Sequence, residues 1–172
     1  KTLSKGNQQK VQLIATLIHE PQLIILDEPF SGLDPVNAEL LKEGILSLKK
    51  QGSCVIFSSH NMEHVEKICD HLVMLNNGKS VLNGVVHEIR ESFGRTKVFL
   101  ESPITRDEIA LLDGVTDVRE REDQTLEITL SNPEVGKEIF RLATADGYIP
   151  MFNQQPPTLE EIFKQKVGEA NV

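Results

Sequence analysis

Apolar residues in the first half of the chain follow two different periods. From Ser4 they recur at helical spacing until Pro21 ends the pattern, which predicts a helix. The apolar run at residues 22–26 is continuous and rich in β-branched residues, which is typical of a buried strand covered on both faces. The stretch from Asp34 to Gly52 returns to helical spacing and opens with an N-cap and a proline. It predicts a second helix.

The pattern then alternates between short strands and a helix. A buried strand at 53–59, a helix at 61–70 and a strand at 71–75 are followed by the turn "NNGK" and a strand at 80–84. Strands that alternate with helices predict an α/β fold with an open, mostly parallel sheet.

The second half has a different order of elements. Strands are predicted at 96–102, 115–121, 126–131 and 148–153, and helices at 105–114, 133–147 and 158–167. The order β-α-β-β-α-β, with one more helix after it, is that of a small α+β ferredoxin-like domain.

Charge also divides the chain. Residues 1–86 contain 8 lysines, no arginine and 9 acidic residues, whereas most of the net charge of -8 lies after them. This shift favours a boundary near residues 85–93, and we expect domains at 1–88 and 89–172. The acidic balance argues against nucleic acid as a partner. No apolar run reaches the roughly 18 residues that a membrane span needs.

Two cysteines, Cys54 and Cys69, lie in apolar segments without C-x-x-C spacing. This pattern indicates two buried thiols in a reducing cytosol.

The strand at 22–26 leads into two adjacent carboxylates, Asp27 and Glu28. The carboxyl end of a strand is where open α/β sheets present ligand-binding groups. There an aspartate can hold Mg²⁺ and a glutamate can activate water, although a solvated acidic turn explains the same residues. Pro29 predicts an extended backbone at Glu28, so that the two side chains diverge.

Other polar residues are ambiguous when taken singly. Asp34 is suited to capping the helix that follows it. His60 ends a strand, and its i, i+4 spacing from His64 lacks the neighbouring glutamate of a zinc-protease helix. Ser4 can cap its own helix or bind a phosphate at that helix start.

Four motifs that occur in a fixed order indicate a protein family more specifically than any one of them does alone. "LSKGNQQKV", "LIILDEP", "SGLD" and "SSH" together resemble the signature motif, Walker B motif, D-loop and switch histidine of ATP-binding cassette (ABC) ATPases, over residues 1 to about 90. The rest of the chain, from about residue 96, is similar to the accessory C-terminal domain of exporter-type members, although less specifically.

The resemblance implies a partial P-loop NTPase fold and specific roles. It implies that Asp27 binds Mg²⁺, that Glu28 is the general base and that His60 senses the γ-phosphate. It also implies a group of residues that touch ATP: Ser4, Gly6, Gln8 and Asp34. The implied partners are a second ATPase subunit, whose ATP the signature motif would face, and a membrane permease that holds the protein at the cytoplasmic face of the membrane.

The phosphate loop G-x-x-x-x-G-K-[ST] does not occur in the 172 residues. We therefore expect a C-terminal piece of an exporter ATPase that is inactive alone. The alternative is a non-catalytic module for dimerisation or regulation.

Overall fold

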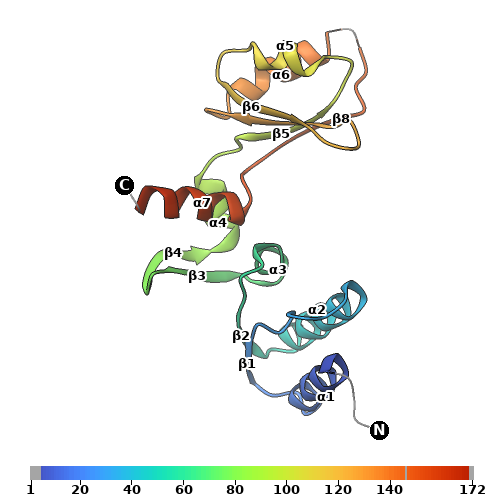
Figure 1. The fold of residues 1–172 in the computed structure, drawn as a ribbon, viewed down its shortest axis with the longest axis vertical. Helices are drawn as coiled ribbons and strands as arrows, with labels where there is room; N and C mark the ends of the chain where they lie inside the picture. Colours follow the sequence, from blue (N-terminus) through green and yellow to red (C-terminus); the bar gives the residue numbers. More distant parts are fainter. Residues whose placement is uncertain (1–4, 146, 171–172) are drawn as a thin grey trace. The chain divides into compact units, whose positions relative to one another are not determined.

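The computed structural model describes residues 5–145 and 147–170, and the chain divides into two compact units, Lys1–Cys69 and Asp70–Val172 (Figure 1). Each unit has a hydrophobic core of its own.

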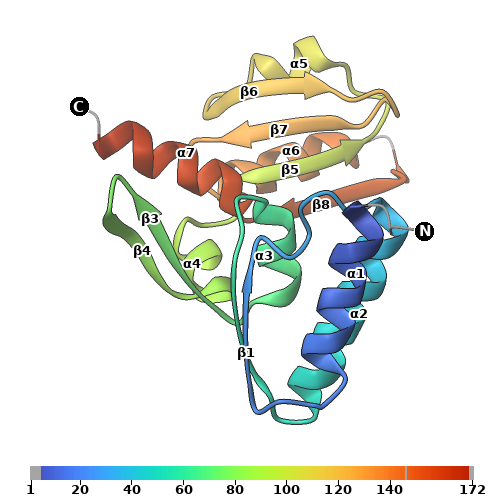
Figure 2. The same cartoon turned by 60° about the horizontal axis from the view of Figure 1, so that its bottom comes forward.

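The first unit contains helices α1 (Lys5–Leu17), α2 (Pro35–Lys50) and α3 (Met62–Ile68) and strands β1 (Leu23–Asp27) and β2 (Cys54–Ser58). Figure 2 shows α1 alongside α2, and residues of both helices line one groove. Local signals explain α2 well. Asp34 caps it, Pro35 occupies its first position, and Gly52 with φ 101° follows its end. The predicted helices and strands of this unit are confirmed.

Strands β1 and β2 pair in parallel, with Leu23 opposite Cys54 and Asp27 opposite Ser58. The core of the unit comprises Ile24, Leu26, Phe30, Leu41, Ile45, Leu48 and Ile68. By contrast, Leu23 and Ile25 on the other face of β1 are 55% and 69% exposed. Our prediction of a strand covered on both faces is wrong for the described residues, because this core packs on one face of a two-stranded sheet.

The second unit opens with a hairpin of β3 (His71–Asn76) and β4 (Lys79–Val85), followed by α4 (Val86–Ser92). Asn76 pairs with Lys79, so the loop has two residues, Asn77 and Gly78, with φ of 49° and 75°. Positive φ at both positions matches a type I′ turn, as "NNGK" predicts.

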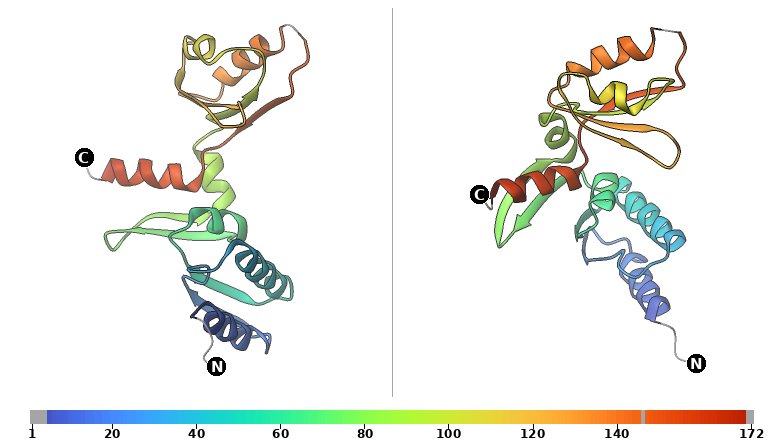
Figure 3. Two further views of the ribbon diagram at one scale, coloured as in Figure 1. Left: turned by 45° about the vertical axis from the view of Figure 1, so that its right-hand side comes forward. Right: turned by 45° about the horizontal axis from the view of Figure 1, so that its top comes forward.

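The remaining elements are β5 (Lys97–Glu101), α5 (Arg106–Ala110), β6 (Val115–Glu120), β7 (Leu126–Leu130), α6 (Val135–Ala143), β8 (Met151–Gln155) and α7 (Leu159–Ala170). The four strands form one antiparallel sheet in the order β6-β7-β5-β8. Alternate residues such as Val98, Leu100 and Ile128 are fully buried, and they pack with Ile109 of α5 and Ile139 of α6. Both helices therefore cover the same face of the sheet (Figure 3). The predicted β-α-β-β-α-β unit is confirmed.

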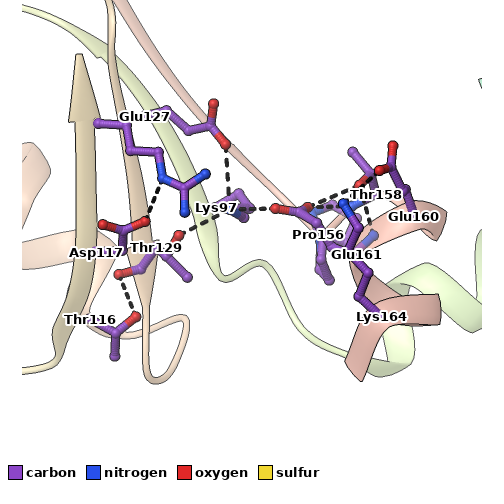
Figure 4. A network of polar contacts seen from close by, with 12 residues as sticks. Lys97, Thr116, Asp117, Glu127, Thr129, Pro156, Thr158, Glu160, Glu161 and Lys164 are labelled. Carbon is purple, nitrogen blue, oxygen red and sulfur yellow. Dashed lines mark hydrogen bonds and ion pairs between the residues drawn. The ribbon is translucent and has the colours of Figure 1, made fainter. Parts of the chain in front are cut away.

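A network of polar contacts centred on Lys97 joins β5 to β7 and α7 (Figure 4). The Lys97 ammonium lies 2.5 Å from Glu161 and 3.4 Å from Glu127, and it donates to the Thr129 hydroxyl at 3.0 Å. Glu161 also accepts a hydrogen bond from the backbone N–H of Thr158 at 2.9 Å, which caps α7. Since the Lys97 side chain is 13% exposed, this cation is largely desolvated and depends on its partners.

Three expectations differ from the structure. Instead of one mostly parallel sheet, the described strands of the first 88 residues form a parallel pair and a separate antiparallel hairpin. Helix α4 was not predicted, since "VHEIRES" has too few apolar positions to show a helical period. The Cys54 side chain is exposed, because it lies on the uncovered face of the parallel pair, and Cys69 is half-buried; neither of these described residues is in a disulfide.

Candidate functional site

Asp27 and Ser58 lie side by side at the carboxyl ends of β1 and β2. They are direct partners in the parallel register, and both are on the exposed face of the strand pair. The Ser58 hydroxyl donates a hydrogen bond to Asp27 Oδ1. The other carboxylate oxygen of Asp27, Oδ2, has no hydrogen-bond partner among the described residues.

Glu28 follows directly in a tight turn. Its backbone N–H points at Ser58, 3.2 Å from both the carbonyl oxygen and the hydroxyl oxygen of that residue. The φ of Glu28 is 43°, so our prediction of an extended backbone before Pro29 is wrong. The left-handed conformation costs about 1–2 kcal/mol in a non-glycine residue. Contacts across the strand pair and the turn bond from Ser31 N–H to the Glu28 carbonyl, at 3.0 Å, stabilise it.

His60 holds the side chain of Glu28. One carboxylate oxygen, Oε1, accepts the backbone N–H of His60 at 2.9 Å and lies 2.8 Å from its Nδ1. The Glu28 side chain is 36% exposed and the imidazole is 82% exposed. The structure thus brings together three residues predicted from the sequence, Asp27, Glu28 and His60.

His64 has a different environment from His60. Its ring lies against Phe30, with 4.1 Å between ring centroids, and its Nδ1 is buried without a hydrogen-bond partner in the described part of the chain. Phe30 in turn meets Phe57 edge to face at 6.1 Å. Within residues 5–145 and 147–170 no group of three or more His, Cys, Asp or Glu side chains is placed to hold a metal by itself.

Asp34 is the N-cap of α2. Its carboxylate accepts from the backbone N–H of Asn37 at 3.1 Å and from the Asn37 side-chain amide. These backbone and side-chain hydrogen bonds from Asn37, and the charge of Lys10 in α1, lower the pKa of Asp34 from its ordinary value. The capping interpretation is confirmed, and a role toward ATP stays a prediction.

The remaining predicted nucleotide contacts lie at the front of the chain. Ser4 falls outside the described residues, whereas Gly6 and Gln8 lie in the first turns of α1. No observation tests their contact with ATP.

The oxygen donors of the site fit a magnesium ion. Mg²⁺ is commonly held by one or two protein carboxylates, with waters and substrate phosphates completing an octahedron. Asp27 supplies one exposed carboxylate with a free oxygen, at the strand edge where α/β sheets bind ligands. A structural zinc centre takes four protein ligands, whereas a magnesium site needs only one or two carboxylates.

Sequence reasoning missed Ser58 as part of this site. A partial signal was present in the sequence, because the strands before "DEP" and "SSH" are both predicted to end at these motifs. The register, which pairs Asp27 with Ser58, comes from the structure. The stacking of His64 on Phe30 had no comparable signal.

Comparison with protein families and known proteins gives matches in both halves of the chain. The family model "ATP-binding protein DrrA1-3-like, C-terminal domain" matches residues 84–167. A second model, for an AAA domain described with the AbiEii toxin of type IV toxin–antitoxin systems, matches residues 1–66. No helix in the described ranges is both long and apolar enough to cross a membrane.

Curated relatives share the same description. An uncharacterized ABC transporter ATP-binding protein of Alkalihalophilus pseudofirmus is 46% identical over 168 residues, which cover 98% of this chain and 62% of the relative. YhaQ of Bacillus subtilis, another such protein, is 46% identical over 96% of this chain and 55% of its own length. The chain therefore spans between half and two thirds of the length of these relatives.

A solved structure, titled as the ATP-binding subunit of an ABC transporter, matches 54% of this chain and 38% of its own, with a TM-score of 0.50 and 39% identity. The mixed α/β fold with small sheets agrees with part of a P-loop ATPase. These matches confirm the resemblance that the four motifs indicate: the chain belongs to the family of ABC transporter ATP-binding proteins.

Proposed function

We propose that the protein containing this chain hydrolyses ATP and thereby drives transport through a separate membrane permease. The observation that carries the proposal is the contact between Glu28 and His60, next to Asp27, at the carboxyl ends of two parallel strands. A carboxylate pair at this edge, one member held by a histidine, suits phosphoryl transfer to water.

Glu28 is the proposed general base. His60 occupies Oε1 through two contacts, whereas Oε2 has no hydrogen-bond partner within the described residues and is available for a proton. In the proposed step a water attacks the γ-phosphorus and passes its proton to Glu28. The bond from the γ-phosphorus to the bridging oxygen breaks, and ADP and phosphate leave.

Asp27 is the proposed magnesium ligand, directly or through water. When bound, Mg²⁺ neutralises charge that develops on the phosphate oxygens. The carboxylate of Asp27 is oriented for this by its bond from Ser58.

Four further residues are proposed to contact ATP: Ser4, Gly6, Gln8 and Asp34. A helix start offers free N–H groups and a positive dipole end, which favour a phosphate. By the family resemblance this ATP is held by a second ATPase subunit, so we propose an ATP-dependent dimer.

The test of the proposal is Glu28→Gln in the full-length protein. We expect kcat to fall by about 10²- to 10⁴-fold, the contribution typical of a general base, with ATP affinity unchanged. Glu39→Gln is the matched control, since Glu39 is an exposed glutamate of α2 whose carboxylate lies 2.5 Å from the Lys42 ammonium. Near-normal turnover of the Glu28 variant would contradict the general-base assignment, whereas a parent without turnover would favour a non-catalytic module.

Residues 1–172 alone are proposed to be inactive. They contain no G-x-x-x-x-G-K-[ST] motif, whose N–H groups and lysine make most phosphate contacts in P-loop ATPases. Each missing charge-assisted hydrogen bond is worth about 1.5–3 kcal/mol, so about three of them weaken a micromolar site at least a thousandfold. Calorimetric titration of ATP into this chain should show no binding, and a micromolar dissociation constant would refute the reasoning.

Export is the proposed direction of transport, with the protein on the cytoplasmic face of the membrane through its permease. A Nod factor export ATP-binding protein of Rhizobium etli is 33% identical over 96% of this chain and 52% of its own length. We also propose that the ATPase part ends near residue 88 and that residues 89–172 form the accessory domain. Purification of the full-length protein from membranes should recover the permease with it.

A further inference from the structure

Two consecutive serines precede His60, and their hydroxyls have different partners. Ser58 donates to Asp27 Oδ1 and lies 3.2 Å from the backbone nitrogen of Glu28. Ser59 instead accepts from the backbone N–H of Asn61, at 3.1 Å, next to the start of α3. Only the first serine touches the two carboxylate residues.

The strand register fixes this difference. Ser58 is the direct partner of Asp27 in the parallel pair, so both side chains project from the same face of the strands. Ser59 is one residue further on, where side chains point the other way. The chemistry of the Ser58 hydroxyl also suits this position. A hydroxyl has one hydrogen to donate and lone pairs that accept, so the same oxygen can donate to Asp27 and accept from the Glu28 N–H.

We propose that Ser58 is a positioning residue for the proposed ATP hydrolysis. Its hydroxyl orients the Asp27 carboxylate toward the magnesium ion and holds the Glu28 backbone in its left-handed conformation, with φ 43°. One side chain thus fixes the cation ligand relative to the general base. The inference rests on the proposed function, but it assigns a role to Ser58, whereas the motif "SSH" implies one only for His60.

Loss of the Ser58 hydroxyl should weaken the binding of Mg²⁺ more than any other property of the site. Without its donor, Asp27 can rotate away from the cation, and outer-shell partners of metal ligands typically contribute about 10- to 100-fold to metal affinity or activity. The Glu28 N–H keeps the Ser58 carbonyl as a partner, so the turn should loosen without unfolding.

The experiment compares Ser58→Ala, Ser58→Thr and the control Ser59→Ala in the full-length protein. The first readout is ATP affinity at graded Mg²⁺ concentrations in a Glu28→Gln background, so that turnover does not interfere. We expect Ser58→Ala to need about tenfold more Mg²⁺ for half-maximal tightening of ATP binding. Ser58→Thr restores the hydroxyl and should restore the parent curve, and Ser59→Ala should follow the parent throughout.

The second readout is hydrogen exchange of the peptide that contains the Glu28 amide, without nucleotide. Loss of one neutral hydrogen bond should speed this exchange about fivefold in Ser58→Ala and leave it unchanged in Ser59→Ala. Ser58→Cys keeps the size of the side chain with a weaker donor, and it should fall between alanine and the parent even if alanine impairs folding.

The outcomes separate the two proposals. A full-length parent that does not hydrolyse ATP would overturn the proposed function, and the role of Ser58 with it. An active parent whose Ser58→Ala and Ser58→Cys variants keep the parent magnesium curve would overturn the positioning role alone.

Discussion

Lys97 should anchor helix α7 to the sheet of the second unit. Its ammonium contacts Glu161 of α7, Glu127 of β7 and the Thr129 hydroxyl, and its side chain is 13% exposed (Figure 4). Lys97→Met keeps the length of the side chain but removes every donor. Glu161, 35% exposed, then loses its cation, whereas Glu127, 22% exposed, keeps the Arg121 guanidinium at 3.0 Å. Hydrogen bonds to charged groups are worth about 1.5–3 kcal/mol each, and partial exposure of Glu161 reduces that figure, so we expect a net loss of about 2 kcal/mol.

Hydrogen exchange followed by mass spectrometry measures this loss locally. A loss of about 2 kcal/mol speeds exchange of α7 amides roughly thirtyfold when exchange reports on the opening equilibrium. Lys164→Met is the matched control on the same helix. Lys164 pairs with Glu160 at 2.6 Å, but both side chains are more than 60% exposed, and such a pair contributes about 0.3–0.5 kcal/mol. Equal effects of the two variants would refute the reasoning from burial.

Three further predictions concern single positions. Burial raises the pKa of Glu161, but hydrogen bonds from Lys97 and Thr158 outweigh it and hold that pKa below 4.5. The resulting stabilisation should be complete above the ordinary pKa and be lost as pH falls from there through the lowered pKa of the folded protein. Glu161→Gln should flatten this part of a stability profile measured by denaturation. Asp34→Ala should destabilise α2 by removing its N-cap, and Asp34→Asn should destabilise it much less, as followed by circular dichroism during denaturation. Gly136→Ala should lower the free energy of unfolding by about 1–3 kcal/mol, because the new Cβ would clash with the Gln154 side-chain amide. Alternative rotamers are restricted because the Gln154 amide donates to the carbonyls of Arg95 and Pro133 at 2.8 and 2.7 Å, and a thermal melt checks the effect.

Local signals made most of the fold predictable. Helix α2 is predictable because its cap, its proline and its apolar spacing all lie within one stretch of sequence. The turn is predictable because Asn77 and Gly78 both readily adopt the positive φ that it requires. Predictions failed where residues distant in the sequence determine the backbone conformation or the exposure of a side chain. The backbone of Glu28 depends on Ser58, which is 30 positions away, and a rule about the residue before proline takes no account of that contact. The exposure of Ile25 and Cys54 depends on which elements cover each face of the sheet. The apolar content of a strand does not predict this.

The two contacts that His60 makes with Glu28 differ in kind, and this difference bears on the proposed mechanism. The backbone N–H of His60 lies two residues beyond the end of β2 and is held by the main chain, whereas its imidazole is 82% exposed and can rotate. An exposed polar contact of this sort contributes about 0–1 kcal/mol, so the imidazole can leave Glu28 at little cost. The carboxylate would stay in place, because the backbone donor still holds Oε1 at 2.9 Å. His60 could therefore turn to a phosphate while Glu28 remains aimed at the water, which is the division of tasks that the proposed hydrolysis requires.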